Sequence, residues 1–138
     1  MKLDALCVRD IMSHDTFHVQ PTTAADECAR QLALHKLSGA PVTDQYGRLI
    51  GFVSEQDLLG PLSQSAYHCD SPGSVAKVMS EDVLFVTPDQ QVMQVVNLMM
   101  GSKPKIYPVV EEGRLIGIVT RRLVMRALLQ AQQTCTPV

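Results

Sequence analysis

Several features that often reveal a protein's class are scarce in this chain or missing from it. Tryptophan is absent, and aromatic residues make up only 4% of the 138 residues. The core must therefore be aliphatic, and the hydrophobic content of 46% is sufficient to build one. No apolar run approaches the roughly 20 residues that a helix needs to cross a bilayer. We therefore expect a globular protein with no membrane span.

A strong charge of one sign and close cysteine pairs are also missing. The net charge of −2 argues against a nucleic-acid partner, because such proteins present a basic face. The four cysteines lie far apart, which favours neither a structural zinc site nor a disulfide framework. Small apolar thiols in a reducing compartment, and an N-terminus without a secretory apolar region, predict a cytoplasmic protein.

Catalytic and metal-binding motifs are missing as well. The sequence has no P-loop, no G-x-G-x-x-G and no visible Ser-His-Asp arrangement. His14 and His18 lie in a predicted loop and strand, where four residues span about 13 Å, too far to share a metal. The triplet His68-Cys69-Asp70 is a weak metal candidate. We predict no metal site and no catalytic cofactor; an enzyme or metal protein using these histidines and the cysteines is an alternative.

What the chain does contain is an internal repeat. The stretch Gly47–Leu58 recurs in similar form as Gly113–Val124, and the five residues that open it are identical in both copies. Three other residue pairs share an offset of 67 positions: Met12 and Met79, Pro21 and Pro88, and Pro41 and Pro108. Gly51 and Gly117 are 66 positions apart, so one residue is lost between them, in a predicted turn, where deletions are tolerated.

Hydrophobic spacing predicts similar elements in both copies. The first copy is expected to contain a helical turn at 8–13, a strand at 16–19, a helix at 23–37 capped by Thr22 or Thr23 and ended by Ser38-Gly39, strands at 40–43 and 49–53, and a helix from Ser54 to about Leu59, broken by Gly60-Pro61. The second is expected to contain a helix at 89–100, strands at 106–110 and 115–119, and a helix at 121–131.

These elements divide the chain into two small motifs. We expect motif one at 1–62, a connector at 63–74, motif two at 75–131 and a C-terminal tail at 132–138. A copy of about 55 residues has too thin a core to be stable alone, so the two copies must pack together as a single module.

The repeated residues resemble a known family. The matching pieces are Val-x-x-Ile/Val-Met-Ser at 8–13 and 75–80, Val-x-Pro at 19–21 and 86–88, Pro-Val at 41–42 and 108–109, and Gly-x-Val-Ser/Thr-x-x-Asp/Leu at 51–57 and 117–123. Occurring in order and twice, they make nearly the whole chain similar to a tandem pair of cystathionine-β-synthase (CBS) motifs, the Bateman module.

The resemblance implies both a fold and a function. The implied fold is α+β, with two β-α-β-β-α motifs packed sheet to sheet about a pseudo-twofold axis. The implied function is regulatory and non-catalytic: the cleft between the motifs binds AMP, ADP, ATP or S-adenosylmethionine. The resemblance further implies a homodimer that regulates an enzyme or transporter. The alternative is a ligand-free dimerisation module whose clefts have decayed.

Ser54 and Asp57 match the family positions that bind ribose. A carboxylate can accept both hydroxyl protons of a vicinal diol. The same Ser-x-x-Asp spacing also forms a capping box, which would stabilise a helix by about 1 kcal/mol without any ligand. The second copy carries Leu123 in place of the acid, so its cleft is expected to bind ribose poorly or to stay empty.

The resemblance assigns two further groups of residues. The adenine side would be formed by Asp15, Thr16, Phe17 and His18, with Pro41 or Val42 as an apolar wall. The phosphate side would be formed by Arg121, Arg122, Lys103 and Lys105. The alternative for these four cations is an ordinary solvated surface.

Overall fold

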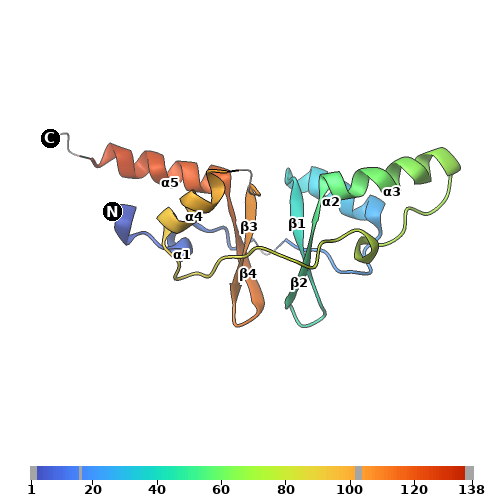
Figure 1. Cartoon of the computed structure of the whole chain (residues 1–138), viewed down its shortest axis with the longest axis horizontal. Coiled ribbons are helices and arrows are strands. Elements are labelled where there is room, and N and C mark those ends of the chain that lie inside the picture. Colours follow the sequence, from blue (N-terminus) through green and yellow to red (C-terminus); the bar gives the residue numbers. More distant parts are fainter. Residues whose placement is uncertain (1–2, 16, 102–103, 136–138) are drawn as a thin grey trace. The chain divides into compact units, whose positions relative to one another are not determined.

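The computed structural model describes residues 3–15, 17–101 and 104–135 (Figure 1). The chain forms two compact units: unit 1 comprises Met1–Thr16 and Leu84–Val138, and unit 2 comprises Phe17–Val83. Each unit combines one two-stranded sheet with helices, which confirms the predicted α+β class. Across the described ranges, no helix is both long and apolar enough to cross a membrane.

Unit 2 is built on the hairpin of β1 (Gly39–Thr43) and β2 (Leu49–Ser54). The strands are antiparallel, and their register runs from Gly39 opposite Ser54 to Thr43 opposite Leu49. The helices α2 (Ala25–His35) and α3 (Glu55–His68) accompany this hairpin, and the 3-10 turn η2 (Val75–Lys77) follows them. The buried core contains Val19, Ala25, Cys28, Leu32, Ala40, Val42, Val53, Leu58 and Val75.

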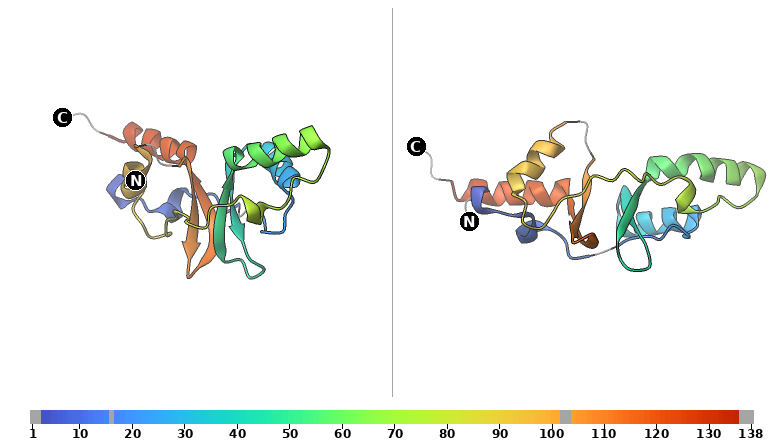
Figure 2. Two further views of the ribbon diagram at one scale, coloured as in Figure 1. Left: turned by 45° about the vertical axis from the view of Figure 1, so that its right-hand side comes forward. Right: turned by 60° about the horizontal axis from the view of Figure 1, so that its bottom comes forward.

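Unit 1 repeats this plan. The antiparallel hairpin of β3 (Ile106–Glu111) and β4 (Arg114–Thr120) carries α4 (Val92–Met99) and α5 (Arg121–Gln133) on one side, as Figure 2 shows from two directions. The N-terminal elements η1 (Leu3–Ala5) and α1 (Val8–Ile11) complete it. The main core contains Val8, Val86, Val95, Met99, Tyr107, Val109, Val119 and Val124.

The opening segment of each sequence copy completes the hairpin of the other copy. Ser13 exchanges two backbone hydrogen bonds with Ile118, at 2.9 and 3.0 Å. Ser80 exchanges two with Phe52, at 2.8 and 2.9 Å. The equivalent residues Val8 and Val75 are fully buried, Val8 in unit 1 and Val75 in unit 2. The boundaries of the compact units therefore differ from those of the sequence repeat. The opening segment of each copy belongs to the unit that contains the hairpin of the other copy.

Three local predictions for the first copy are wrong in detail. The expected strand at 16–19 is reduced to one bridge, between Val19 and Val42, and Thr16 lies outside the described residues. Helix α2 begins after Ala24, because the Thr23 hydroxyl accepts a hydrogen bond from the backbone of Gln20 instead of capping the helix. The helix ends at His35, short of the expected end at Ser38-Gly39, and its C-cap Lys36 adopts the left-handed backbone (φ 56°) that usually favours glycine.

Helix α3 is longer than predicted. The Gly60-Pro61 pair was expected to break it, yet the helix continues to His68. Its C-cap residue, Cys69, adopts a left-handed backbone conformation. Proline near the second turn removes one backbone hydrogen bond, which the rest of the helix tolerates here. The segment 62–68, expected to be helix end and connector, is therefore helical.

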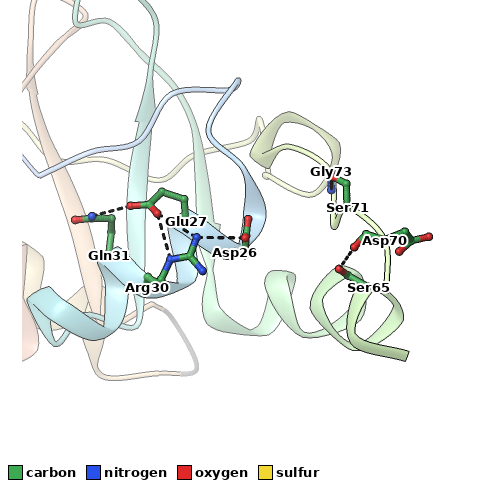
Figure 3. A network of polar contacts seen from close by, with 8 residues as sticks. All are labelled: Asp26, Glu27, Arg30, Gln31, Ser65, Asp70, Ser71 and Gly73. Atoms are coloured by element: carbon green, nitrogen blue, oxygen red, sulfur yellow. Dashed lines mark hydrogen bonds and ion pairs between the residues drawn. The ribbon is translucent and has the colours of Figure 1, made fainter. Parts of the chain in front are cut away.

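Helix α2 carries a charged network on its exposed surface (Figure 3). Arg30 pairs with Asp26 and Glu27, each at 3.2 Å, and Gln31 donates to Glu27 at 2.9 Å. The hydrogen bonds from Gln31 and Arg30 lower the pKa of Glu27. Exposed pairs of this kind contribute little to stability, so the network supports the helix without defining a site.

The cysteines should differ sharply in reactivity. Burial raises the pKa of Cys28 to about 11, whereas Cys69 and Cys135 are exposed. Because the thiolate is the reactive form, iodoacetamide at pH 8 should label the two exposed cysteines in the native protein and Cys28 only after denaturation. Peptide mass spectrometry measures this directly. Native labelling of Cys28 as fast as Cys69 would contradict the buried position.

Candidate functional site

The polar site of unit 2 lies where β2 meets α3. Ser54 ends the strand in an extended conformation and is the N-cap of the helix. Its backbone N–H donates to Asp57 Oδ2 at 2.9 Å, and the Asp57 backbone N–H donates to Ser54 Oγ at 3.2 Å. The capping box considered from the sequence is therefore formed.

The capping box occupies only part of the hydrogen-bond acceptor capacity of the Asp57 carboxylate. Asp57 is only half-buried, and in the described part of the chain its hydrogen bonds from other residues reach Oδ2 alone. A carboxylate offers about four lone-pair positions, so a diol could bond Asp57 while the cap stays intact. The capping and ribose-binding roles are thus compatible, and the second stays a prediction.

The residues expected on the adenine side lie in different surroundings. Phe17 packs on the unit 2 core and stacks on His35, with ring centroids 4.2 Å apart and planes at 26°. His18 is exposed and precedes Val19, whose N–H donates to the Pro41 carbonyl at 3.0 Å. Unit 2 therefore brings 17–19 alongside the buried Pro41. Asp15 belongs to unit 1 and is exposed, and Thr16 lies outside the described residues.

The corresponding junction in unit 1 has only half of the box. The Leu123 N–H donates to Thr120 Oγ1 at 3.2 Å, but the Leu123 side chain cannot accept the return bond. Its apolar side chain also offers nothing to a ribose. This difference between Asp57 and Leu123 is the clearest chemical difference between the two copies.

Three cationic residues, Lys105, Arg121 and Arg122, are located around the start of α5. The Arg121 N–H donates to the Lys105 carbonyl at 2.9 Å, just as Glu55 bonds Ser38 in unit 2. The side chains of Lys105, Arg121 and Arg122 are exposed, and no ion pair within the described ranges involves them. The first turn of α5 contains no acid. A helix N-terminus beside such cations favours an anion. Lys103 lies outside the described residues.

The sequence reasoning missed two residues of unit 1. At the repeat offset of 67 positions, Leu84 corresponds to Phe17 and Phe85 corresponds to His18, and both are exposed. With Leu123, they make the equivalent positions of unit 1 apolar. The offset that relates the prolines of the two copies was the signal that would have found them.

The described residues contain no group of three or more His, Cys, Asp or Glu side chains placed to hold a metal ion. His68 and Cys69, considered from the sequence, lie at the exposed C-terminal end of α3.

A family model described as CBS domain matches the chain twice, at residues 8–63 and 75–130. Among curated proteins, an uncharacterized 17.7 kDa protein of Acidianus ambivalens is 30% identical over 123 residues, covering 88% of this chain and 73% of that protein. Three further curated relatives are longer proteins, of which the chain spans between 14% and 39%.

Solved structures show the same similarity. The crystal structure of CBSX2 in complex with AMP is 32% identical to this chain, with a TM-score of 0.81, and the match covers 93% of this chain and 99% of that one. Another structure identifies CBSX2 as a CBS-pair protein from Arabidopsis thaliana. The CBS domain pair of MJ0100, bound to 5′-methylthioadenosine and S-adenosylmethionine, is 25% identical with a TM-score of 0.77, covering 91% of this chain and 97% of that one.

Proposed function

Since the chain belongs to the CBS domain family and carries its domain twice, we propose that it is a non-catalytic regulatory module for an adenosine-type ligand. The observation that carries the proposal is Asp57, a half-buried carboxylate with unused acceptor capacity at the start of α3. The AMP bound to CBSX2 and the adenosyl ligands bound to MJ0100 support the choice of ligand class.

Each group of residues has one role in this proposal. Asp57 accepts hydrogen bonds from the ribose hydroxyls, and Ser54 holds the carboxylate in place through the cap. Phe17, His18 and Pro41 serve the adenine, with Asp15 and Thr16 beside them in the sequence. Arg121, Arg122, Lys103 and Lys105 neutralise phosphate charge. AMP, ADP, ATP and S-adenosylmethionine all carry the required adenosine.

Regulation would follow from a shift between conformations. A ligand that binds one conformation better raises the population of that conformation, and a partner then responds to the change. We place this module in the cytoplasm as a homodimer that controls an enzyme or a transporter. It has no catalytic cofactor of its own, because adenosine serves as a signal and is not consumed.

The test is a calorimetric titration of the purified chain with AMP, ADP, ATP and S-adenosylmethionine. At least one should bind, and the 2′-deoxy form of the tightest nucleotide should bind about tenfold more weakly, because it lacks one diol hydroxyl. If S-adenosylmethionine is the only ligand, its 2′-deoxy analogue serves the same purpose. Absence of heat with all four ligands would refute the proposal.

A ligand-free dimerisation module is the second candidate. Phe85 and Leu123 favour it, because unit 2 has the polar residues His18 and Asp57 at the equivalent positions. Thermal-shift measurements that show no response to any adenylate, combined with a tight dimer, would support this second candidate over the first.

A further inference from the structure

Unit 1 contains an open apolar pocket at the C-terminal end of α5. Its volume is about 690 Å³, which lies within the range of small-molecule sites. Its apolar part is lined by half-buried side chains from three elements: Leu3 of η1, Met93 of α4, and Leu128 and Ala131 of α5. The same elements share a small buried core, so the walls of the pocket belong to one packed unit (Figure 2). None of the described residues that line it is assigned to the adenosine ligand.

The equivalent positions of unit 2 are mostly polar. At the repeat offsets of 67 and 66 positions, Leu3 corresponds to Asp70, Met93 to Asp26, Ala131 to Ser65, and Leu128 to the apolar Leu62. Ser65 Oγ donates a hydrogen bond to the Asp70 carbonyl, and Asp26 pairs with Arg30 (Figure 3). The fold of a unit therefore does not require an apolar surface at these positions. The apolar lining is a feature of unit 1 alone.

The rim of the pocket is negative. The exposed Asp4 lines it, and no lysine or arginine does so among the described residues. The C-terminal end of a helix carries a partial negative charge, and the last turn of α5 has no basic residue to neutralise it. The nearest arginine along the helix, Arg126, lies about two turns before the end. Asp10 lines a second pocket at the same helix end. The electrostatic potential here therefore favours a cation.

From the apolar lining and the negative rim, we propose that this pocket binds an amphipathic amine, which is an organic cation with an apolar body. The apolar body packs on Leu3, Met93 and Leu128, and the ammonium group lies between Asp4 and the C-terminal end of α5. AMP, ADP and ATP are anions, so the two ligand classes do not compete for one chemistry. The pocket is a second binding site, and the inference does not rest on the proposed function.

Three probes with the same eight-carbon chain test the ligand class: n-octylamine, 1-octanol and octanoate, which are cationic, neutral and anionic at pH 7. The full chain is labelled with ¹³C in its methionine methyl groups, and the Met93 signal is identified with Met93→Leu. Octylamine should shift this signal with a dissociation constant below about 1 mM, because the chain buries apolar surface. Octanol should bind more weakly, and octanoate at least about tenfold more weakly than octylamine. Met79 of unit 2 is the internal control.

Two variants separate the charge of the rim from the apolar lining. Asp4→Asn should weaken octylamine binding about threefold to tenfold and leave octanol binding within about twofold, because only the amine uses the carboxylate. Glu111→Gln removes an exposed acid at the far end of β3 and should change neither affinity. Gln132→Trp should weaken binding of all three probes, because the larger side chain fills the pocket. These side chains are exposed, so far-UV circular dichroism should be unchanged.

Several results would overturn the proposal. Octanoate binding as tightly as octylamine, or an unchanged amine affinity in Asp4→Asn, would show that the rim does not select a cation. Equal shifts of the Met93 and Met79 signals would indicate nonspecific association of the probe. A Met93 signal that responds to protein concentration and to none of the probes would show that a second copy of the chain covers the pocket. The adenylate titration succeeds or fails independently of each result.

Discussion

Replacing Gly117 with alanine is expected to destabilise unit 1 by about 3 kcal/mol or more, enough to unfold a marginally stable domain. A Cβ at Gly117 would overlap the carbonyl of Ser13, which is backbone and cannot rotate away. The collision strikes the two hydrogen bonds between Ser13 and Ile118, at 2.9 and 3.0 Å, which attach the N-terminal segment to β4. Urea unfolding followed by far-UV circular dichroism measures the loss.

The chain offers matched controls for this substitution. At the equivalent Gly51, a Cβ would meet Met79 Sδ at 2.9 Å and the Ser80 carbonyl at 3.0 Å. Because the thioether can move, Gly51→Ala should cost less than Gly117→Ala. Gly60 lies in α3 with no neighbouring atom within 4 Å, so Gly60→Ala should be neutral or stabilising by up to about 1 kcal/mol. Equal midpoints for the Gly117 and Gly60 variants would show that the close approach is unimportant.

Replacing Asp57 with asparagine is expected to weaken adenosine-ligand binding between about tenfold and about a hundredfold, because two charge-assisted bonds to the ribose become neutral ones. The asparagine oxygen can still accept from the Ser54 N–H, which in the wild-type protein donates to Asp57 Oδ2 at 2.9 Å. Stability should therefore fall by less than about 1 kcal/mol. Calorimetric titration and thermal unfolding of the same sample separate the two effects.

The matched control is the corresponding acid of helix α1. Asp10 accepts a hydrogen bond from the Cys7 N–H at 2.9 Å, three residues before it, as Asp57 does from Ser54. Asp10→Asn should have a similar small effect on stability and none on ligand affinity. Unchanged ligand affinity in the Asp57 variant, or an equal loss of affinity in the Asp10 variant, would show that Asp57 does not bind the ribose.

The sequence allowed the two hairpins and the Ser54 cap to be predicted because their signals are local. Short apolar runs on either side of a turn identify the strands, and a Ser-x-x-Asp spacing identifies the cap. The ends of α2 and α3 could not be placed so well. Lys36 adopts a backbone conformation typical of glycine, and Pro61 stays inside a helix, so both positions depart from the local preference of the residue.

Which hairpin receives which opening segment was beyond sequence reasoning. Val8–Ser13 and Val75–Ser80 are so similar that each fits either hairpin by pattern alone. The site was predictable only in part for a related reason. The repeat shows that Asp57 and Leu123 are equivalent, but it gives no information on how many acceptor positions the capping box leaves open. That property depends on the hydrogen-bond geometry of one carboxylate.

The exchange of opening segments has a consequence for synthesis on the ribosome. Unit 2 is one continuous stretch, Phe17–Val83, and all of its segments are available once Val83 has emerged. Unit 1 must wait, because Ser13 is made early and its partner Ile118 is made near the end. Contacts between such distant residues close slowly. The bonds between Ser13 and β4 therefore cannot form until translation is almost complete.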